Sequence, residues 1–229
     1  MLINKILKKI NKMKKIIIFL VTSMFFFGQA SAVDFSVSVG LSGSTAVFHA
    51  EGEENENGEK SKEDATGIAD FGSVFAEASI NDMISIGVDF VTDSISSETA
   101  ESVVDDITTS ATNTRATQKV QVDFDDLTTY YVMVNLTEGL YVRGGVINVD
   151  VITNESLGTG STYGDTTMDG TVMGVGYNRT LDNGVFFRVE GNYMDLGSKS
   201  LTATNNSENT ISLNDLIGAS AKFSIGKSF

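Results

Sequence analysis

The sequence predicts an all-β fold: an eight-stranded antiparallel up-and-down transmembrane β-barrel. Three observations support this prediction. Apolar and polar residues alternate in eight separate stretches, short turns alternate with long polar connections, and the last stretch continues to Phe229. An alternation of period two is typical of a strand with one apolar face. A closed barrel explains a strand at the end of the chain, because its last strand must pair with its first.

The first 32 residues predict export. They contain six lysines and no acidic residue, then an apolar run over 16–27, and they end in Ala30-Ser31-Ala32. A basic start, a short apolar segment and a small-x-small end are the features of a secretory signal peptide. We therefore expect residues 1–32 to be removed and residues 33–229 to form the barrel domain.

The remaining chain is strongly acidic and has no cysteine. Removal of the signal peptide leaves ten of the sixteen basic residues and all thirty acidic residues. This charge argues against a nucleic-acid partner, and the lack of cysteine excludes a disulfide framework. No apolar run outside the signal peptide is long enough for a membrane helix, so if this chain spans a bilayer, it does so as strands.

The first four strands are expected at 35–41 (extending as far as 47), 68–80, 84–90 and 119–136. In the fourth, Val122, Phe124, Tyr130 and Val132 share one parity and are expected on one face. Asn81-Asp82 predicts a tight hairpin between the second and third strands. An acidic loop over 51–66 and a Ser/Thr/Asp-rich loop over 92–118 are expected as long connections.

The last four strands are expected at 140–146, 173–178, 185–193 and 217–229. Residues 137–139 and 181–184 form short turns, and Asn183-Gly184 predicts positive φ angles in a tight hairpin. Polar loops are expected over 153–169 and 198–214. The three short turns all lie at one end of the strands and the four long loops at the other, as in barrels with short periplasmic turns and long external loops.

The polar parity of these strands carries balanced charge: three acidic and three basic residues, namely Glu77, Asp89, Arg143, Arg188, Glu190 and Lys222. A narrow lumen requires such balance because an unpaired buried charge is very costly. We expect a lumen charge network in which Arg143 and Arg188 pair with acids of this set. It either fills the barrel, whose eight strands leave room only for their own side chains, or forms a gated ion path. A soluble barrel with its apolar face inward is the alternative fold.

The mature chain resembles, as a pattern and most clearly from about Thr171 onward, the small eight-stranded outer-membrane barrels, of the kind shared by the OmpA-type transmembrane domain and OmpW-like proteins. The likeness depends on the segments 174–177 (GVGY), 181–184 (LDNG), 185–193 (VFFRVEGNY) and 223–229 (FSIGKSF). It implies a bacterial outer-membrane location among lipid and lipopolysaccharide. It also implies insertion by the barrel-assembly machinery, which reads a terminal aromatic signal, here Phe223, Ile225, Gly226 and Phe229. Lys227 departs from that signal, and the chain has no tryptophan for the aromatic girdles.

Residues typical of catalysis are sparse. Some barrels of this architecture are lipid A acylases or deacylases that use His with Ser. Here His49 is the only histidine, and no serine lies at a spacing from it that indicates a catalytic pair. No zinc, nucleophile-elbow or phosphate-loop motif occurs. We therefore expect no enzyme, cofactor or metal site. Residues 51–64 are interpreted as a solvated, mobile acidic loop, with weak divalent-cation binding as the alternative.

Three functions follow from these observations. The first is a structural or envelope-surface protein with a lumen filled by side chains. The second is a small passive channel or OmpW-like conduit for small or hydrophobic solutes. The third, which has the least support, is a lipid-modifying enzyme built around His49.

Overall fold

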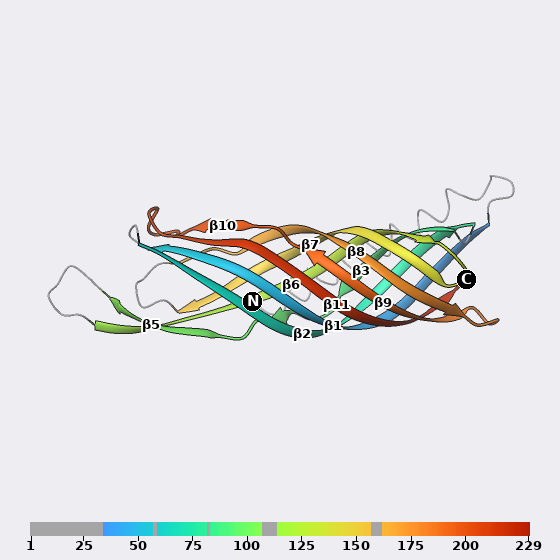
Figure 1. The fold of residues 1–229 in the computed structure, drawn as a ribbon, viewed down its shortest axis with the longest axis horizontal. Coiled ribbons are helices and arrows are strands. Elements are labelled where there is room, and N and C mark those ends of the chain that lie inside the picture. Colours follow the sequence, from blue (N-terminus) through green and yellow to red (C-terminus); the bar gives the residue numbers. More distant parts are fainter. Residues whose placement is uncertain (1–33, 57–58, 82, 107–113, 157–161) are drawn as a thin grey trace, which may run out of the picture.

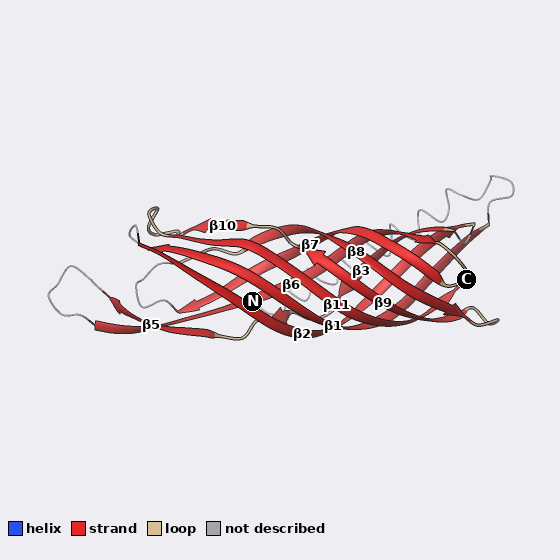
Figure 2. Cartoon of the chain, in the orientation of Figure 1, coloured by secondary structure: helices blue, strands red, loops and turns tan. Residues whose placement is uncertain are grey.

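The computed structural model describes residues 34–56, 59–81, 83–106, 114–156 and 162–229. The expected signal peptide lies outside these residues, as does Asp82 of the first turn. Within the described part of the chain, no helix is long and apolar enough to cross a membrane. The secondary structure there consists of strands, turns and loops (Figure 2).

Eight antiparallel strands close into a ring, which confirms the predicted fold (Figure 1). Their order around the barrel is β1-β2-β3-β6-β7-β8-β9-β11, and β11 returns to pair with β1 from Ser38↔Ser228 to Asn55↔Thr210. The strands are β1 (Phe35–Glu56), β2 (Glu59–Ile80), β3 (Ile84–Val91), β6 (Thr114–Asn135), β7 (Leu140–Ser156), β8 (Thr166–Thr180), β9 (Val185–Asp195) and β11 (Thr210–Ser228). Closure leaves the membrane-spanning wall without an open edge.

Three further strands lie in the predicted loops: β4 (Ile95–Ser96), β5 (Ala100–Asp106) and β10 (Lys199–Thr202). β4 and β5 pair with β6, and β10 pairs with β11. The prediction of a mobile acidic loop over 51–66 is wrong, since β1 and β2 stay in register from Phe35↔Ile80 to Glu56↔Glu59. The sequence interpretation weighed charge and composition there, whereas a backbone ladder does not depend on side-chain charge.

The short turns lie together at one end of the barrel, and the long connections extend from the other (Figure 1). In the turn after β8, the Gly184 amide donates to the Leu181 carbonyl over 2.9 Å, and Gly184 has a φ of 82°. Asn183 does not share this positive φ, contrary to the prediction. The hairpin is thus a turn closed by one left-handed glycine, which accommodates this φ without the steric cost of a Cβ atom.

The outer surface near the turns is apolar. Leu41, Ile86, Val132, Val175 and Phe223 are each between 46% and 61% exposed, so these side chains point away from the barrel axis rather than toward one another. Along β9 this belt runs from Val185 to Tyr193, roughly 20 Å in height at a strand tilt of about 40°. Membrane barrels carry an apolar band of about 25 Å.

Tyrosine and phenylalanine lie at the two borders of the belt. Tyr177, Phe187 and Phe229 are exposed near the turns, and Tyr130 and Tyr193 are exposed toward the opposite border. Aromatic rings at both borders are typical of the girdles that sit at the membrane–water interfaces. The girdles form here without tryptophan.

A β-bulge in β6 overturns the prediction that Val122, Phe124, Tyr130 and Val132 share one face. Asp126 and Leu127 together oppose the single residue Val149 of β7, and Asp126 has a φ of 55°. The extra residue exchanges the two faces. Tyr130 is therefore half exposed on the outside, while Phe124 packs against the buried interior.

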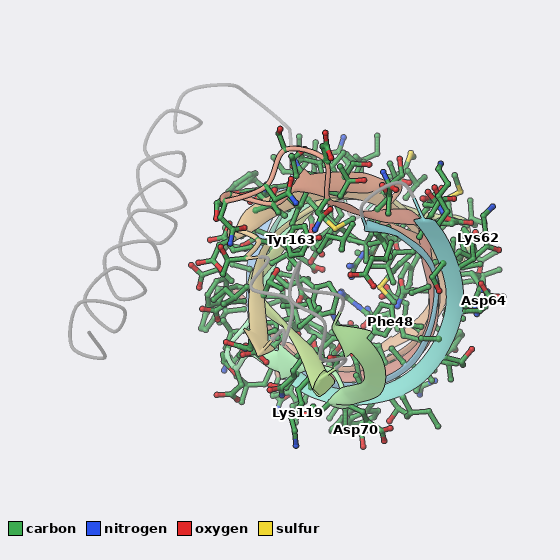
Figure 3. The ribbon with its side chains drawn as sticks, turned by 90° about the vertical axis from the view of Figure 1, so that its left-hand side faces the viewer. Phe48, Lys62, Asp64, Asp70, Lys119 and Tyr163 are labelled. Carbon is green, nitrogen blue, oxygen red and sulfur yellow. The ribbon has the colours of Figure 1, made fainter. Side chains whose placement is uncertain are left out.

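The barrel exchanges the polarity of its two surfaces along its length. Beyond the belt, the outer face carries exposed acidic residues such as Asp70, Asp169 and Asp195. The interior at that level is apolar, and Phe48 points into the ring (Figure 3). Its buried members are Ala46, Val91, Ile95, Leu127, Ile147, Val149, Val151, Met168, Val172, Met194, Leu196 and Leu216. The barrel thus suits hydrocarbon outside at the turn end, and water outside at the long-connection end.

Candidate functional site

All six charged residues named from the polar parity point into the barrel at the level of the belt. Glu77, Asp89, Arg143, Arg188 and Glu190 are at most 8% exposed, and the side chain of Lys222 is also 8% exposed. They come from β2, β3, β7, β9 and β11, so the layer crosses the barrel. The antiparallel register places these residues at the same level along the barrel axis. Lys222, for example, lies opposite Glu190 in the β9–β11 ladder.

The six charges form three ion pairs. Arg188 Nη1 lies 2.6 Å from Glu77 Oε1 and Nη2 lies 3.0 Å from Oε2, a bidentate arrangement. Arg143 Nη1 lies 3.1 Å from Glu190 Oε1. Lys222 Nζ pairs with Asp89. Each buried ion therefore has an opposite charge, which offsets the cost of removing it from water.

Aromatic side chains complete this layer. The Tyr131 hydroxyl donates to Glu77 over 2.7 Å, and the Tyr141 hydroxyl donates to Glu190 over 2.8 Å. The Arg143 guanidinium lies 4.1 Å from the centre of the Tyr131 ring. Arg188 lies within 5.5 Å of three ring centres, those of Phe75, Tyr141 and Phe186. Such cation–π contacts add to the ion pairing of these buried charges. The layer is both charged and densely filled.

Each of these four rings lies over a glycine of the neighbouring strand. The pairs in register are Gly40 with Phe75, Gly87 with Tyr131, Gly176 with Tyr141 and Gly226 with Phe186. A Cβ atom at any of these glycines would come closer than 3 Å to the ring. The glycines thus leave room for the rings to lie flat across the lumen, as in aromatic–glycine pairs of other sheets.

The sequence interpretation missed these aromatic residues as part of the site. It named only the six charged residues of the polar parity and gave the aromatic residues no role. A usable signal was present, because an aromatic residue on the inward parity stands beside an inward glycine of the next strand. Reading it requires the register between strands, which alternation alone does not supply.

A polar vestibule opens at the turn end of the barrel. It has a volume of about 540 Å³, and its lining includes Ser38, Ser79 and Ser85. It ends at Glu77 and Arg188, which also line it. Beyond the charged layer lies the apolar interior cluster, in which residues such as Ile147 and Val149 are at most 2% exposed. Water that enters the vestibule thus meets a charged layer and then an apolar one.

The predicted assembly residues lie along β11 and at its end. Phe223, Ile225 and Phe229 are exposed on the outer face, and the Phe223 ring centre lies 6.4 Å from that of Phe187. Gly226 instead faces inward and accommodates the Phe186 ring. The Phe229 backbone also exchanges two hydrogen bonds with Val37 of β1, at 2.9 and 3.2 Å. Recognition of these residues by an assembly machinery stays a prediction.

His49 lies within β1 rather than at its end, since the strand continues to Glu56. Its Nδ1 lies 3.1 Å from the Thr66 hydroxyl on the outer face. In the same region Lys60 and Lys62 lie 2.7 and 3.7 Å from Glu53. The hydrogen bond from Lys60 lowers the pKa of Glu53 below its ordinary value. Among the described residues, no three His, Cys, Asp or Glu side chains converge as metal ligands.

No protein-family model and no curated protein sequence matches the chain. Solved structures with a similar fold include the outer membrane protein OprG from Pseudomonas aeruginosa, with a TM-score of 0.49 and 11% identity over 85% of this chain and 95% of that one. The outer membrane protein AlkL has a TM-score of 0.49 and 12% identity, over 88% and 93% of the two chains. The outer membrane protease OmpT from Escherichia coli has a TM-score of 0.48 and 11% identity, over 87% and 99%.

At this identity such likenesses carry no activity or ligand over to the chain, so its own surface decides the assignment. The ring is closed, its outside carries an apolar belt bordered by aromatic residues, and its inside at that level is charged. Strands cross a lipid bilayer only in a closed barrel of this kind, and the outer membrane is where bacteria place them. The chain is therefore a small eight-stranded integral outer-membrane β-barrel.

Proposed function

We propose that the protein is a non-conducting envelope-surface barrel whose lumen is filled by its own side chains. Its role is structural and lies in the wall that extends beyond the membrane. The observation that carries the proposal is the double filling of the interior, by three buried ion pairs and then by an apolar cluster. Such a barrel anchors an exposed surface without making the membrane permeable.

The charged layer supports closure because its members pair with one another. An ion that passes this level would have to separate Arg188 of β9 from Glu77 of β2, which two hydrogen bonds connect although β11 and β1 lie between these strands in the ring. Separation of a buried pair costs about 3–5 kcal/mol. The apolar cluster then offers a desolvated ion no polar partner.

Planar-bilayer recording tests this proposal. The purified chain inserted at neutral pH is expected to give no stepwise conductance. The matched variant is Arg188→Ala with Ile147→Gly and Val149→Gly, which thins both layers and is expected to raise the frequency of openings. Stable conductance steps from the unaltered chain would contradict the closed lumen.

The conduit for hydrophobic solutes is the second candidate, and the apolar interior beyond the belt is the observation that favours it. A solute admitted there would be apolar, but the charged layer would stop it before the vestibule. Uptake of a fluorescent alkane analogue into vesicles containing the barrel tests this candidate. Uptake no faster than into protein-free vesicles would dismiss it.

Neither an enzyme nor a metal site forms part of the proposal. Activity on lipid substrates that is lost in a His49→Ala variant would restore the enzyme hypothesis. Weak divalent-cation binding over 51–64 also stays a prediction, and calorimetry with millimolar Ca²⁺ tests it. Absence of heat would end it.

A further inference from the structure

The wall of the barrel has a seam beyond the membrane, along one edge of β2. β2 pairs with β1 over its whole length, but with β3 only from Ser73 to Ile80. β4 and β5 continue along the chain after β3, yet they pair with β6. Among the strands that the structure describes, none pairs with the β2 edge from Lys60 to Asp70.

The backbone groups that face the seam are identified by the last bond before it. The Thr92 amide donates to the Gly72 carbonyl over 3.2 Å, so the peptide groups of Gly72 point toward the seam. β2 has no register shift against β1, so the other even-numbered residues point the same way. They are Lys60, Lys62, Asp64, Thr66, Ile68 and Asp70. A row of unpaired amides and carbonyls is a template for an added strand.

The side chains along this edge leave it accessible. Residues 64–68 are exposed on both faces of the strand, and Ile68 is 75% exposed. Lys62 and Asp64 point away from the barrel when it is viewed from this end (Figure 3). An added strand along residues 64–68 would therefore cover exposed side chains, and β4 lies near β2 without pairing with it.

The charge of the region selects the kind of strand. Residues 51–70 contain eight acidic residues and two lysines. Both lysines already lie within 4 Å of Glu53. Glu51 stands in register between Asp64 and Asp215, and like charges in directly opposite positions repel. A strand with positive side chains would relieve this repulsion.

We propose that the seam edge of β2, from Lys60 to Asp70, binds an extended cationic peptide segment as an additional antiparallel or parallel strand. Backbone hydrogen bonds to the even-numbered residues supply the affinity, and the surrounding carboxylates supply the preference for lysine and arginine. The inference does not depend on a closed lumen, because the seam lies beyond the charged layer.

Amide hydrogen exchange of the full chain in detergent micelles tests the geometry. The probe is a ten-residue peptide in which lysine alternates with threonine, and its control is the same peptide with every backbone amide N-methylated. The unmodified peptide is expected to slow exchange at Thr66 and Ile68 at least about tenfold. Exchange at Ala65 and Gly67 is expected to stay unchanged, because their amides face β1. Slowing by both peptides alike, or at none of these residues, would overturn the proposal.

A variant pair tests the same edge from the protein side. Thr66→Pro with Ile68→Pro removes two donors that face the seam and leaves the β1–β2 hydrogen bonds in place. Thr66→Val with Ile68→Val keeps both donors. We expect the proline variant to bind the peptide about tenfold more weakly, from the loss of two hydrogen bonds, and the valine variant to bind normally. Equal affinity of the two variants would show attraction by charge alone and would refute strand addition.

Discussion

Replacement of Arg188 by methionine is the sharpest test of the charged layer. The change keeps an unbranched side chain but removes the Arg188 guanidinium from Glu77, which is 1% exposed. The hydrogen bond that Glu77 accepts from the Tyr131 hydroxyl remains. Removal of one member of a buried pair costs about 3–5 kcal/mol. We expect the free energy of unfolding to fall by that amount.

The double variant Arg188→Met with Glu77→Gln separates loss of the pair from loss of the side chains. Glutamine is neutral and still accepts the hydrogen bond from Tyr131, so the uncompensated charge disappears. The double variant is expected to recover about 2–3 kcal/mol relative to the sum of the single variants. A matched control is Arg179→Met at the exposed end of β8, with an expected change below about 0.5 kcal/mol.

Urea unfolding in lipid vesicles, followed by the electrophoretic mobility of unheated samples, measures these values because folded and unfolded barrels migrate differently. Additive single variants that each cost less than about 1 kcal/mol would refute the reasoning. Such a result would mean that water or lipid headgroups solvate Glu77. The lumen would then be open at that level.

Three further predictions concern other parts of the wall. Gly176→Ala is expected to destabilise the barrel by about 1–3 kcal/mol in the same assay, because the new Cβ would clash with the Tyr141 ring. The control Gly144→Ala, on the open outer face, should destabilise it by less than about 0.5 kcal/mol. Ile147→Ala should cost about 2–5 kcal/mol through the cavity it leaves in the apolar interior, and more than Val146→Ala on the exposed face; equal costs would mean that the interior is not packed. An NMR titration of Glu53 should give a pKa below the ordinary glutamate value, because the hydrogen bond from Lys60 lowers it. The contribution of Glu53 to stability is therefore present at neutral pH and is lost as the pH falls through that lowered value.

Alternation identified the wall and its charged side because both follow from one backbone property, the opposite orientation of successive side chains. The six lumen charges were found in this way, and the structure brings all six together as three pairs. Parity could not supply the partners, since pairing across the lumen depends on register. The sequence also could not predict the exchange of faces in β6, because the alternation of apolar and polar residues looks the same with or without the bulge at Asp126.

The acidic region showed the opposite weakness. Composition over 51–66 is typical of a loop, but continued pairing with a regular neighbour holds the backbone as strand. The contacts of the lumen's aromatic residues with inward glycines likewise depend on two strands at once. In each case the missing information was non-local, and a single strand does not contain it.

The exchange of surface polarity along the barrel is tested most directly by single-cysteine spin labels on β1, which the absence of native cysteine makes straightforward. A label at Leu41 is expected to be accessible to oxygen and shielded from a water-soluble nickel complex, and a label at Glu51 is expected to show the reverse. A label at Ser42, which points inward, should be shielded from both reagents. Access of the nickel complex to Leu41, or to Ser42 at the rate seen for Glu51, would contradict a barrel with hydrocarbon outside and a filled interior.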